Sequence, residues 1–196
     1  MNTYTLYYNK PAELWTDALP LGNGSLGAMC YSGIKSDKIS LNHDTLWSGH
    51  PRKVIKDGAY DSYVRAQKMA MEGLYTEAND ELQQNFLTCW SQAYLPFGDL
   101  VLTFDKKDVD NYERRLDLSN AVLTSSYNSN GKTYKKTAFI SYPHDVLVYR
   151  ITSEEKEPFS FSLNISCPLK SQVYIDENIL IVDGECPGDA DTHSPI

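Results

Sequence analysis

Hydrophobic and polar residues alternate with a period of two along most of the chain, which is the pattern of half-buried β-strands. In residues 159–165, apolar residues alternate with serines and an asparagine, so we expect one buried and one wet face; the apolar residues are Phe159, Phe161, Leu163 and Ile165. Similar β-prone runs recur between turn residues at 4–8, 26–31, 38–41, 100–104, 112–118, 122–127, 133–141 and 146–152, with a last pair around 176–178.

Residues that favour turns lie directly between these runs. Asn130-Gly131 is the clearest, because Asn and Gly adopt positive φ at low cost. Residues 26–31 and 38–41 form an expected hairpin around Ser32-Gly33. Closely spaced strands without intervening helices predict a mainly β fold, an antiparallel β-sandwich.

The period changes to about 3.6 between residues 57 and 88. An apolar stripe with helical spacing runs through Leu74, Ala78, Leu82 and Phe86. Gly73 is a suitable stop for a preceding helix. We therefore expect a short helical hairpin inserted in the β domain, and no repeat, because no second copy occurs.

Charge and composition limit the classes of partner that we expect this chain to bind. The chain has 196 residues, a net charge of −8, 41% hydrophobic and 22% charged residues, which is typical of one globular domain without a membrane span. Nucleic-acid binding is not expected, because no basic patch is present. The pairs Lys106-Lys107 and Lys135-Lys136 are interpreted as solvated faces of strands.

Cofactor and metal chemistry is not indicated. The 4 cysteines show neither C-x-x-C pairing nor zinc-finger spacing, so we expect free thiols, with Cys30 buried in an apolar strand. The 4 histidines are scattered, and a metal site needs convergent ligands. The glycine-rich turn around Asn23 lacks a phosphate-loop frame, and tight backbone packing is our explanation for its glycines. The first residues lack a basic segment followed by an apolar one, which favours a cytoplasmic location in a bacterium.

Several ordered motifs carry a resemblance to a known family. They are residues 8–29 (YNKPAELWTDALPLGNGSLGAM), 41–49 (LNHDTLWSG), 94–100 (YLPFGDL), 112–118 (YERRLDL) and 184–187 (GECP). Together they resemble the amino-terminal domain of glycoside hydrolase family 95, which consists mainly of inverting α-L-fucosidases. The resemblance covers nearly the whole chain.

The resemblance implies a supersandwich-like domain that is longer than this chain, so we expect an incomplete sandwich with an unpaired edge. It also implies that the catalytic groups lie on an (α/α)6 barrel that follows this domain and is absent from the chain. The expected partners are that barrel and, through the parent enzyme, a fucosylated oligosaccharide with a terminal, α-1,2-linked fucose. We expect no catalytic residue within the chain itself.

Five residues are predicted to bind substrate at the cleft rim or barrel interface: Asn42, His43, Asp44, Trp47 and Tyr94. Their side chains can hydrogen-bond sugar hydroxyls and stack on a ring. The competing interpretation is that Asn42 and Asp44 cap a turn while Trp47 packs. Many family members have Glu where this chain has His43.

Two further alternatives remain. The chain could be a non-catalytic carbohydrate-binding or interaction module, which an exposed aromatic platform on one sheet would favour. The parent could also act on α-L-galactosides, which differ from α-L-fucosides only at C6.

Overall fold

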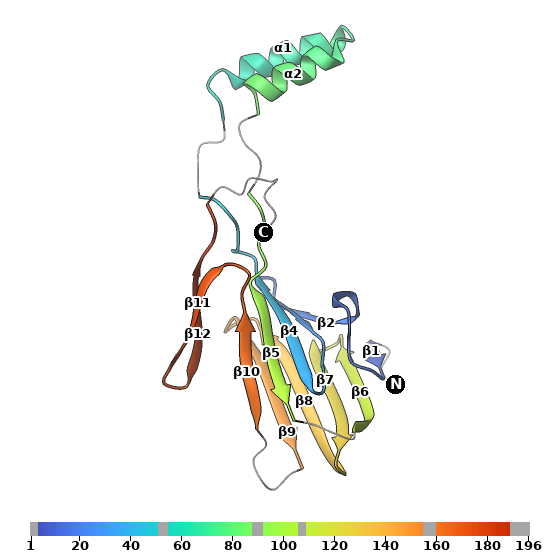
Figure 1. Ribbon diagram of the computed structural model, residues 1–196. Coiled ribbons are helices and arrows are strands. Elements are labelled where there is room, and N and C mark those ends of the chain that lie inside the picture. Colours follow the sequence, from blue (N-terminus) through green and yellow to red (C-terminus); the bar gives the residue numbers. More distant parts are fainter. Residues whose placement is uncertain (1–3, 51–54, 88–91, 106–108, 155–159, 189–196) are drawn as a thin grey trace. The chain divides into compact units, whose positions relative to one another are not determined.

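The computed structural model describes residues 4–50, 55–87, 92–105, 109–154 and 160–188 (Figure 1). The chain divides into two compact units. One contains the chain up to Trp47 and from Tyr94 to Pro187, and the other contains residues 48–93. The first unit is built from strands, and the second carries both α-helices.

One sheet of the first unit has the strand order β1-β6-β7-β8-β9, and every pairing in it is antiparallel. Its strands are β1 (Thr5–Tyr8), β6 (Val109–Asp117), β7 (Val122–Ser129), β8 (Lys132–Ser141) and β9 (Val146–Ser153). The predicted turn at Asn130-Gly131 is confirmed, with φ values of 53° and 71° that connect β7 to β8.

The second sheet has the order β10-β5-β4-β3-β2 and is also antiparallel. Its strands are β2 (Leu19–Gly22), β3 (Leu26–Cys30), β4 (Ser36–His43), β5 (Gly98–Phe104) and β10 (Phe161–Ser166). A short 3-10 helix, η1 (Trp15–Asp17), precedes β2, and a separate hairpin is formed by β11 (Lys170–Asp176) and β12 (Ile179–Glu185). The predicted hairpin of residues 26–31 and 38–41 is confirmed as β3 and β4.

The hydrophobic core is formed by alternate residues of strands from both sheets. Its buried members are Leu19, Leu21, Ala28, Cys30, Ile39, Leu102, Phe104, Leu116, Leu123 and Ala138. The alternation is regular in β7, where every second residue is buried. The mainly β, antiparallel sandwich predicted from the sequence is confirmed.

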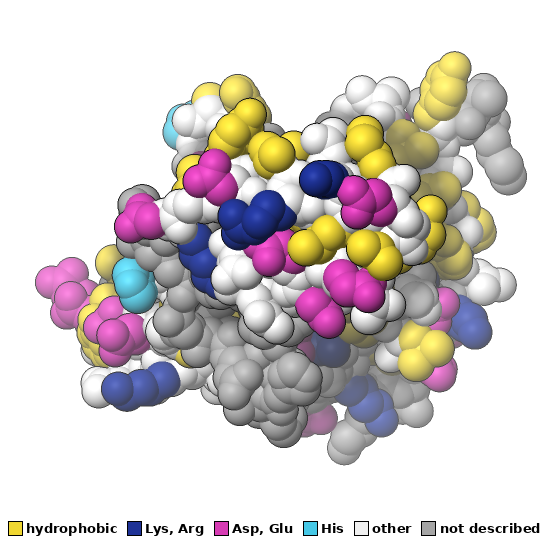
Figure 2. Space-filling view, turned by 90° about the horizontal axis from the view of Figure 1, so that it is seen from above, with side chains coloured by type: hydrophobic (Ala, Val, Ile, Leu, Met, Phe, Trp, Pro, Cys, Tyr) yellow, Lys and Arg dark blue, Asp and Glu magenta, His cyan; other side chains and the backbone are white. Residues whose placement is uncertain are grey.

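Both predicted helices are present as α1 (Ala59–Met71) and α2 (Tyr75–Asn85). Gly73 separates them in the left-handed conformation, at φ 82°, which a residue with a Cβ adopts at a cost. Arg65 of α1 donates to Glu81 of α2 at 2.6 Å. On the face shown in Figure 2, acidic and basic side chains are interspersed among exposed apolar ones.

The predicted buried face of the strand around residues 159–165 is wrong for two described residues. Phe161 and Leu163 are 47% and 44% exposed. Leu163 pairs with Leu102, a core residue, so it points to the inner side of the sheet. It stays uncovered because β10 is an edge strand and β9, the last strand of the opposite sheet, packs against β3, three strands away. Phe159 lies outside the described residues.

The prediction that Lys135-Lys136 is a solvated face is wrong for Lys136, whose side chain is 0% exposed. Lys136 and Ala138 share the inner side of β8, whereas Lys135 faces solvent. The Lys136 ammonium donates to Asp37 Oδ2 at 2.7 Å and to the Gly33 carbonyl. Asp37 provides the opposite charge, which lets a lysine occupy this position. Lys106 and Lys107 lie outside the described residues.

The network around Lys136 joins the two sheets. Asp37, at the start of β4, also accepts hydrogen bonds from the Gly33 N–H at 2.9 Å and from the Tyr149 hydroxyl of β9. The Lys136 ammonium lies 4.8 Å from the centre of the Phe104 ring. Burial, ahead of the neighbouring Asp37 charge, raises the pKa of Tyr149 and holds its hydroxyl protonated as a donor.

Arg114 ties the amino-terminal segment to the first sheet. It is buried, its Nε donates to the Lys10 carbonyl at 2.9 Å, and its Nη1 donates to the Asp17 carbonyl at 2.8 Å. The guanidinium also lies over the Tyr8 ring, 4.3 Å from its centre. Within the motif 112–118, this residue therefore has a structural role.

Candidate functional site

Three loops of the first unit meet in an exposed polar cluster, which we define by Asn23, His43, Asp44, Thr45 and Asp145. Asn23 lies in the turn between β2 and β3, Asp145 lies between β8 and β9, and the other three lie at and just after the end of β4. The cluster therefore contains residues from two of the motifs described above, 8–29 and 41–49.

Asn23 closes the turn between β2 and β3 and also contacts the turn between β8 and β9. Its Oδ1 accepts from the N–H groups of Ser25 and Leu26, at 2.9 and 2.8 Å, which closes the turn. Its Nδ2 donates to Asp145 Oδ1 at 2.7 Å and to the Ser141 carbonyl at 3.3 Å. Tight packing, our explanation for the glycines here, is wrong for Gly24 and Gly27, because a Cβ at either position would meet nothing within 4 Å; Gly24 instead adopts φ 103°.

His43 lies between two carboxylates. Its Nδ1 is 3.1 Å from Asp44 Oδ1, and its Nε2 is 3.2 Å from Asp145 Oδ2. The Thr45 backbone N–H points to Nδ1 at 3.3 Å and can only donate. A proton on Nε2 is donated to Asp145, whereas a proton on Nδ1 is donated to Asp44, so either tautomer of the neutral ring satisfies one of the two carboxylates.

The cluster favours ionised Asp145. Hydrogen bonds from Asn23, then from His43, hold the pKa of Asp145 below its ordinary value of 3.8. Such a carboxylate accepts hydrogen bonds at neutral pH and is a poor proton donor. The cluster can thus bind hydroxyl groups, but Asp145 does not suit the role of general acid in glycoside cleavage.

Two aromatic side chains lie beside this cluster: Trp47, which follows it in the chain, and Tyr94, which contacts Trp47. The Trp47 indole donates from Nε1 to the Asp44 carbonyl at 2.8 Å. Its ring centre lies 5.1 Å from that of Tyr94, at an interplanar angle of 51°, and a β-bridge joins the two residues. Trp47 and Tyr94 are 46% and 49% exposed, so their rings present an apolar surface to solvent.

The structure brings four of the five predicted residues into one connected group: His43, Asp44, Trp47 and Tyr94. Asn42 does not join it, because its Oδ1 accepts the following backbone N–H of His43 at 2.8 Å and so shapes the chain locally. Asp44 also accepts a hydrogen bond from Ser25 through Oδ2, at 3.4 Å. Substrate binding by these residues stays a prediction.

Sequence reasoning missed Asn23 and Asp145 as members of the cluster. Asn23 lies in a glycine-rich turn and Asp145 follows Pro143 by two positions, so each has the local pattern of an ordinary turn residue. Their separation of 122 positions gives no local signal that the two side chains meet. Only the antiparallel sheet topology brings these turns together.

Among the described residues, no group of three or more His, Cys, Asp or Glu side chains is arranged to hold a metal ion. Cys30, Cys167 and Cys186 are free thiols, as predicted, and Cys89 lies outside the described residues. No helix in the described part of the chain is long and apolar enough to cross a membrane.

Residues 6–195 match the family model described as glycosyl hydrolase family 65, N-terminal domain. The chain belongs to this family. The matched range includes all five motifs and, except for Thr5, both sheets, and the curated relatives that match carry names of fucosidases. The resemblance to an N-terminal domain of the family 95 type is thereby confirmed.

The relatives include Alpha-L-fucosidase 2 of Arabidopsis thaliana, which is 30% identical over 187 residues, 92% of this chain and 22% of the relative. Probable alpha-fucosidase A of Aspergillus niger is 32% identical over 170 residues, 78% of this chain and 21% of the relative. The chain therefore spans about a fifth of the length of these curated relatives.

Proposed function

We propose that this chain is the N-terminal β-sandwich portion of an α-L-fucosidase that hydrolyses terminal, α-1,2-linked fucose from oligosaccharides with inversion. In this proposal the sandwich braces a helical catalytic barrel, and the polar cluster with Trp47 and Tyr94 forms part of the rim of the sugar cleft. The observation that carries the proposal is the match to fucosidases across nearly the whole chain.

The geometry of the cluster supports a binding role. Ionised Asp145 and the His43 ring offer hydrogen-bonding groups beside the exposed pair of Trp47 and Tyr94. Sugars present hydroxyl groups at the edge of the ring and C–H groups on its faces, so hydrogen-bonding groups and an aromatic face recognise them together.

We also propose that the chain alone does not catalyse hydrolysis. Inverting cleavage needs a protonated acid and a base about 6.5–9.5 Å apart on either side of the scissile bond. Asp145, one of the two carboxylates beside His43, has a lowered pKa, which opposes the acid role. The cytoplasmic location stays a prediction of the sequence.

The test uses the longer polypeptide to which we assign this chain, and the 196-residue chain beside it. The longer polypeptide should release fucose from 2′-fucosyllactose, with the first-formed anomer inverted by NMR, and should act more slowly on the corresponding α-L-galactoside. The chain alone should release none. Fucose release by the chain at the rate of the longer polypeptide would refute the non-catalytic assignment, and absence of release by the longer polypeptide would refute the activity.

Two variants of the longer polypeptide test the cleft rim. Trp47→Ala should raise KM for 2′-fucosyllactose about tenfold, because it removes an exposed aromatic surface worth about 1–1.5 kcal/mol to a stacked ligand. Tyr7→Ala, which removes an exposed ring on β1 outside the loops of the cluster, is the matched control and should leave KM unchanged. An unchanged KM in Trp47→Ala would remove this residue from the cleft.

A further inference from the structure

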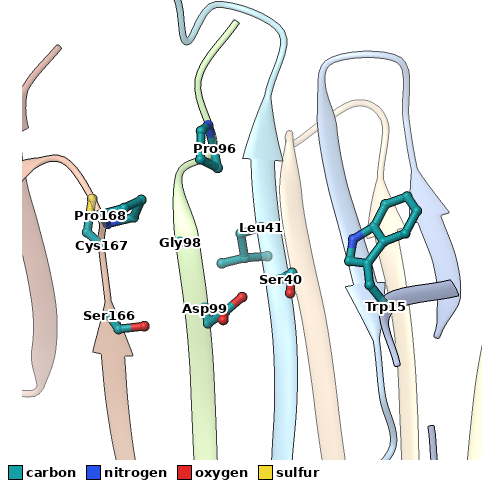
Figure 3. A pocket seen from close by; sticks show the side chains of 9 residues that line it. All are labelled: Trp15, Ser40, Leu41, Pro96, Gly98, Asp99, Ser166, Cys167 and Pro168. Atoms are coloured by element: carbon teal, nitrogen blue, oxygen red, sulfur yellow. The ribbon is translucent and has the colours of Figure 1, made fainter. Parts of the chain in front are cut away.

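A groove of about 440 Å³ crosses the sheet that contains β4, β5 and β10 (Figure 3). Its volume lies within the range of about 300–1,000 Å³ that small-molecule sites occupy. The groove shares no residue with the polar cluster around His43. It is lined by Trp15, Ser40, Leu41, Pro96, Gly98, Asp99, Ser166, Cys167 and Pro168.

The floor of the groove carries a row of polar side chains on three neighbouring strands. Asp99 of β5 pairs with Ser40 of β4 on one side and with Ser166 of β10 on the other. Ile39 and Leu100, the chain neighbours of Ser40 and Asp99, belong to the core or pack against it. Because successive residues of a strand point to opposite faces, the row lies on the outer face of the sheet.

The carboxylate in this row is accessible and lies beside the ammonium of Lys38. Asp99 has a side chain that is 35% exposed, and its Oδ2 lies 3.6 Å from Lys38 Nζ. The Lys38 ammonium is itself held over the Tyr31 ring, 4.3 Å from its centre. Because Lys38 does not line the groove, the Asp99 carboxylate can still accept hydrogen bonds from a ligand in the groove.

Apolar surfaces complete the groove. Trp15, on η1, is 59% exposed, although large aromatic side chains are usually buried. Pro96 and Pro168 flank the opposite end, near β5 and β10 (Figure 3). Gly98 has no side chain to fill the floor, and a Cβ there would meet the Ser166 carbonyl oxygen at 2.2 Å.

We propose that this groove is a second carbohydrate-binding site, which takes an uncharged oligosaccharide and is additional to the cleft proposed above. The Trp15 ring offers a face for a pyranose ring, and Asp99 accepts hydrogen bonds from two neighbouring hydroxyl groups. Ser40 and Ser166 can both donate and accept beside it. Among the described residues that line the groove there is no lysine or arginine, so a carboxylated or sulfated sugar would meet Asp99 with only Lys38, which lies outside the lining, to offset the repulsion.

A protein partner is the competing occupant. An interface core is depleted in charged residues and fits a partner closely, whereas this groove has a carboxylate at its centre between two hydroxyl groups. A ligand that is rich in hydroxyl groups satisfies all three side chains. The observations therefore favour a sugar.

The test titrates the 196-residue chain with 2′-fucosyllactose, lactose and 3′-sialyllactose and follows backbone amide NMR signals. The two neutral sugars should shift signals of Asp99, Ser40 and Ser166 with a dissociation constant on the order of 1 mM, and the acidic sugar should bind at least fivefold more weakly. Trp15→Ala should weaken binding at least tenfold, and Trp15→Phe, which keeps a ring, by less. Asp99→Asn should weaken binding severalfold.

Trp47→Ala is the control that separates this site from the proposed cleft, and it should leave these shifts unchanged. Loss of binding in Trp47→Ala but not in Trp15→Ala would overturn the groove assignment, as would absence of binding up to about 20 mM sugar. Protection of Trp15 from hydroxyl-radical oxidation in the sugar-free longer polypeptide would also overturn it, because polypeptide would then cover the groove. Fucose release is a separate readout, so either proposal can fail alone.

Discussion

Removing one partner of the buried ion pair of Lys136 and Asp37 should destabilise the sandwich strongly, because it leaves the other charge buried without a partner. Lys136→Met keeps the length and apolar character of the side chain and removes the ammonium. The Asp37 carboxylate, only 1% exposed, would then retain the Gly33 N–H and the Tyr149 hydroxyl as donors but lose its cationic partner. An uncompensated buried charge is expensive in a medium of low dielectric constant.

The expected cost can be worked from these contacts. Removing one partner of a buried ion pair lowers the free energy of unfolding by about 3–5 kcal/mol. With a urea m-value of about 2 kcal/mol per M, the unfolding midpoint should fall by roughly 1.5–2.5 M. Asp37→Asn should cost less, because the amide oxygen can still accept from Gly33 and Lys136 can still donate to the Gly33 carbonyl.

The double variant tests whether the destabilisation comes from an unpaired buried charge. Lys136→Met combined with Asp37→Asn leaves no buried charge in the network, so its loss should be smaller than the sum of the single losses by about 2–3 kcal/mol. Urea unfolding followed by circular dichroism in the β-sheet band measures all three variants. Lys135→Met, an exposed lysine in the same strand, is the matched control and should stay within about 0.5 kcal/mol of the parent. Additive single losses, or a loss below about 1 kcal/mol for Lys136→Met, would refute the argument.

Three other outcomes are expected. Leu163→Thr should raise the solubility of the chain, measured by light scattering at increasing concentration, because Leu163 is exposed on an edge strand; greater scattering would contradict this. Burial, ahead of the charge of Asp37, raises the pKa of Cys30 to about 12, so only ~10⁻⁴ of this thiol is ionised at pH 8. Mass spectrometry should then find Cys30 unlabelled by a thiol reagent until urea unfolds the chain. Asn23→Ala removes the main hydrogen bond to Asp145, so NMR titration should show the pKa of Asp145 rising toward 3.8. Because that pKa is depressed in the folded chain, the stabilisation is complete above about pH 4 and is lost as the pH falls; an unmoved pKa in the variant would exclude the assigned cause.

Local sequence patterns determined the class of fold and most of its elements. The period of two placed the strands, Asn130-Gly131 fixed one hairpin, and Gly73 ended the first helix, because each depends on neighbours in the chain. The motifs also identified the family, since their order along the chain is itself sequence information. Of the candidate site, the sequence indicated the segment around His43 and the ring of Tyr94.

Tertiary structure alone decided which distant residues meet and which faces are covered. Lys136 has the same chain neighbours whether it is solvated or buried, and it is buried because β8 places it opposite Asp37. Asp145 joins His43 because antiparallel pairing returns two turns to the same end of the sandwich. Leu163 follows the alternation of a core strand but lies beyond the edge of the facing sheet. Hydrophobic periodicity specifies the direction of a side chain, whereas burial also requires a second layer that covers it.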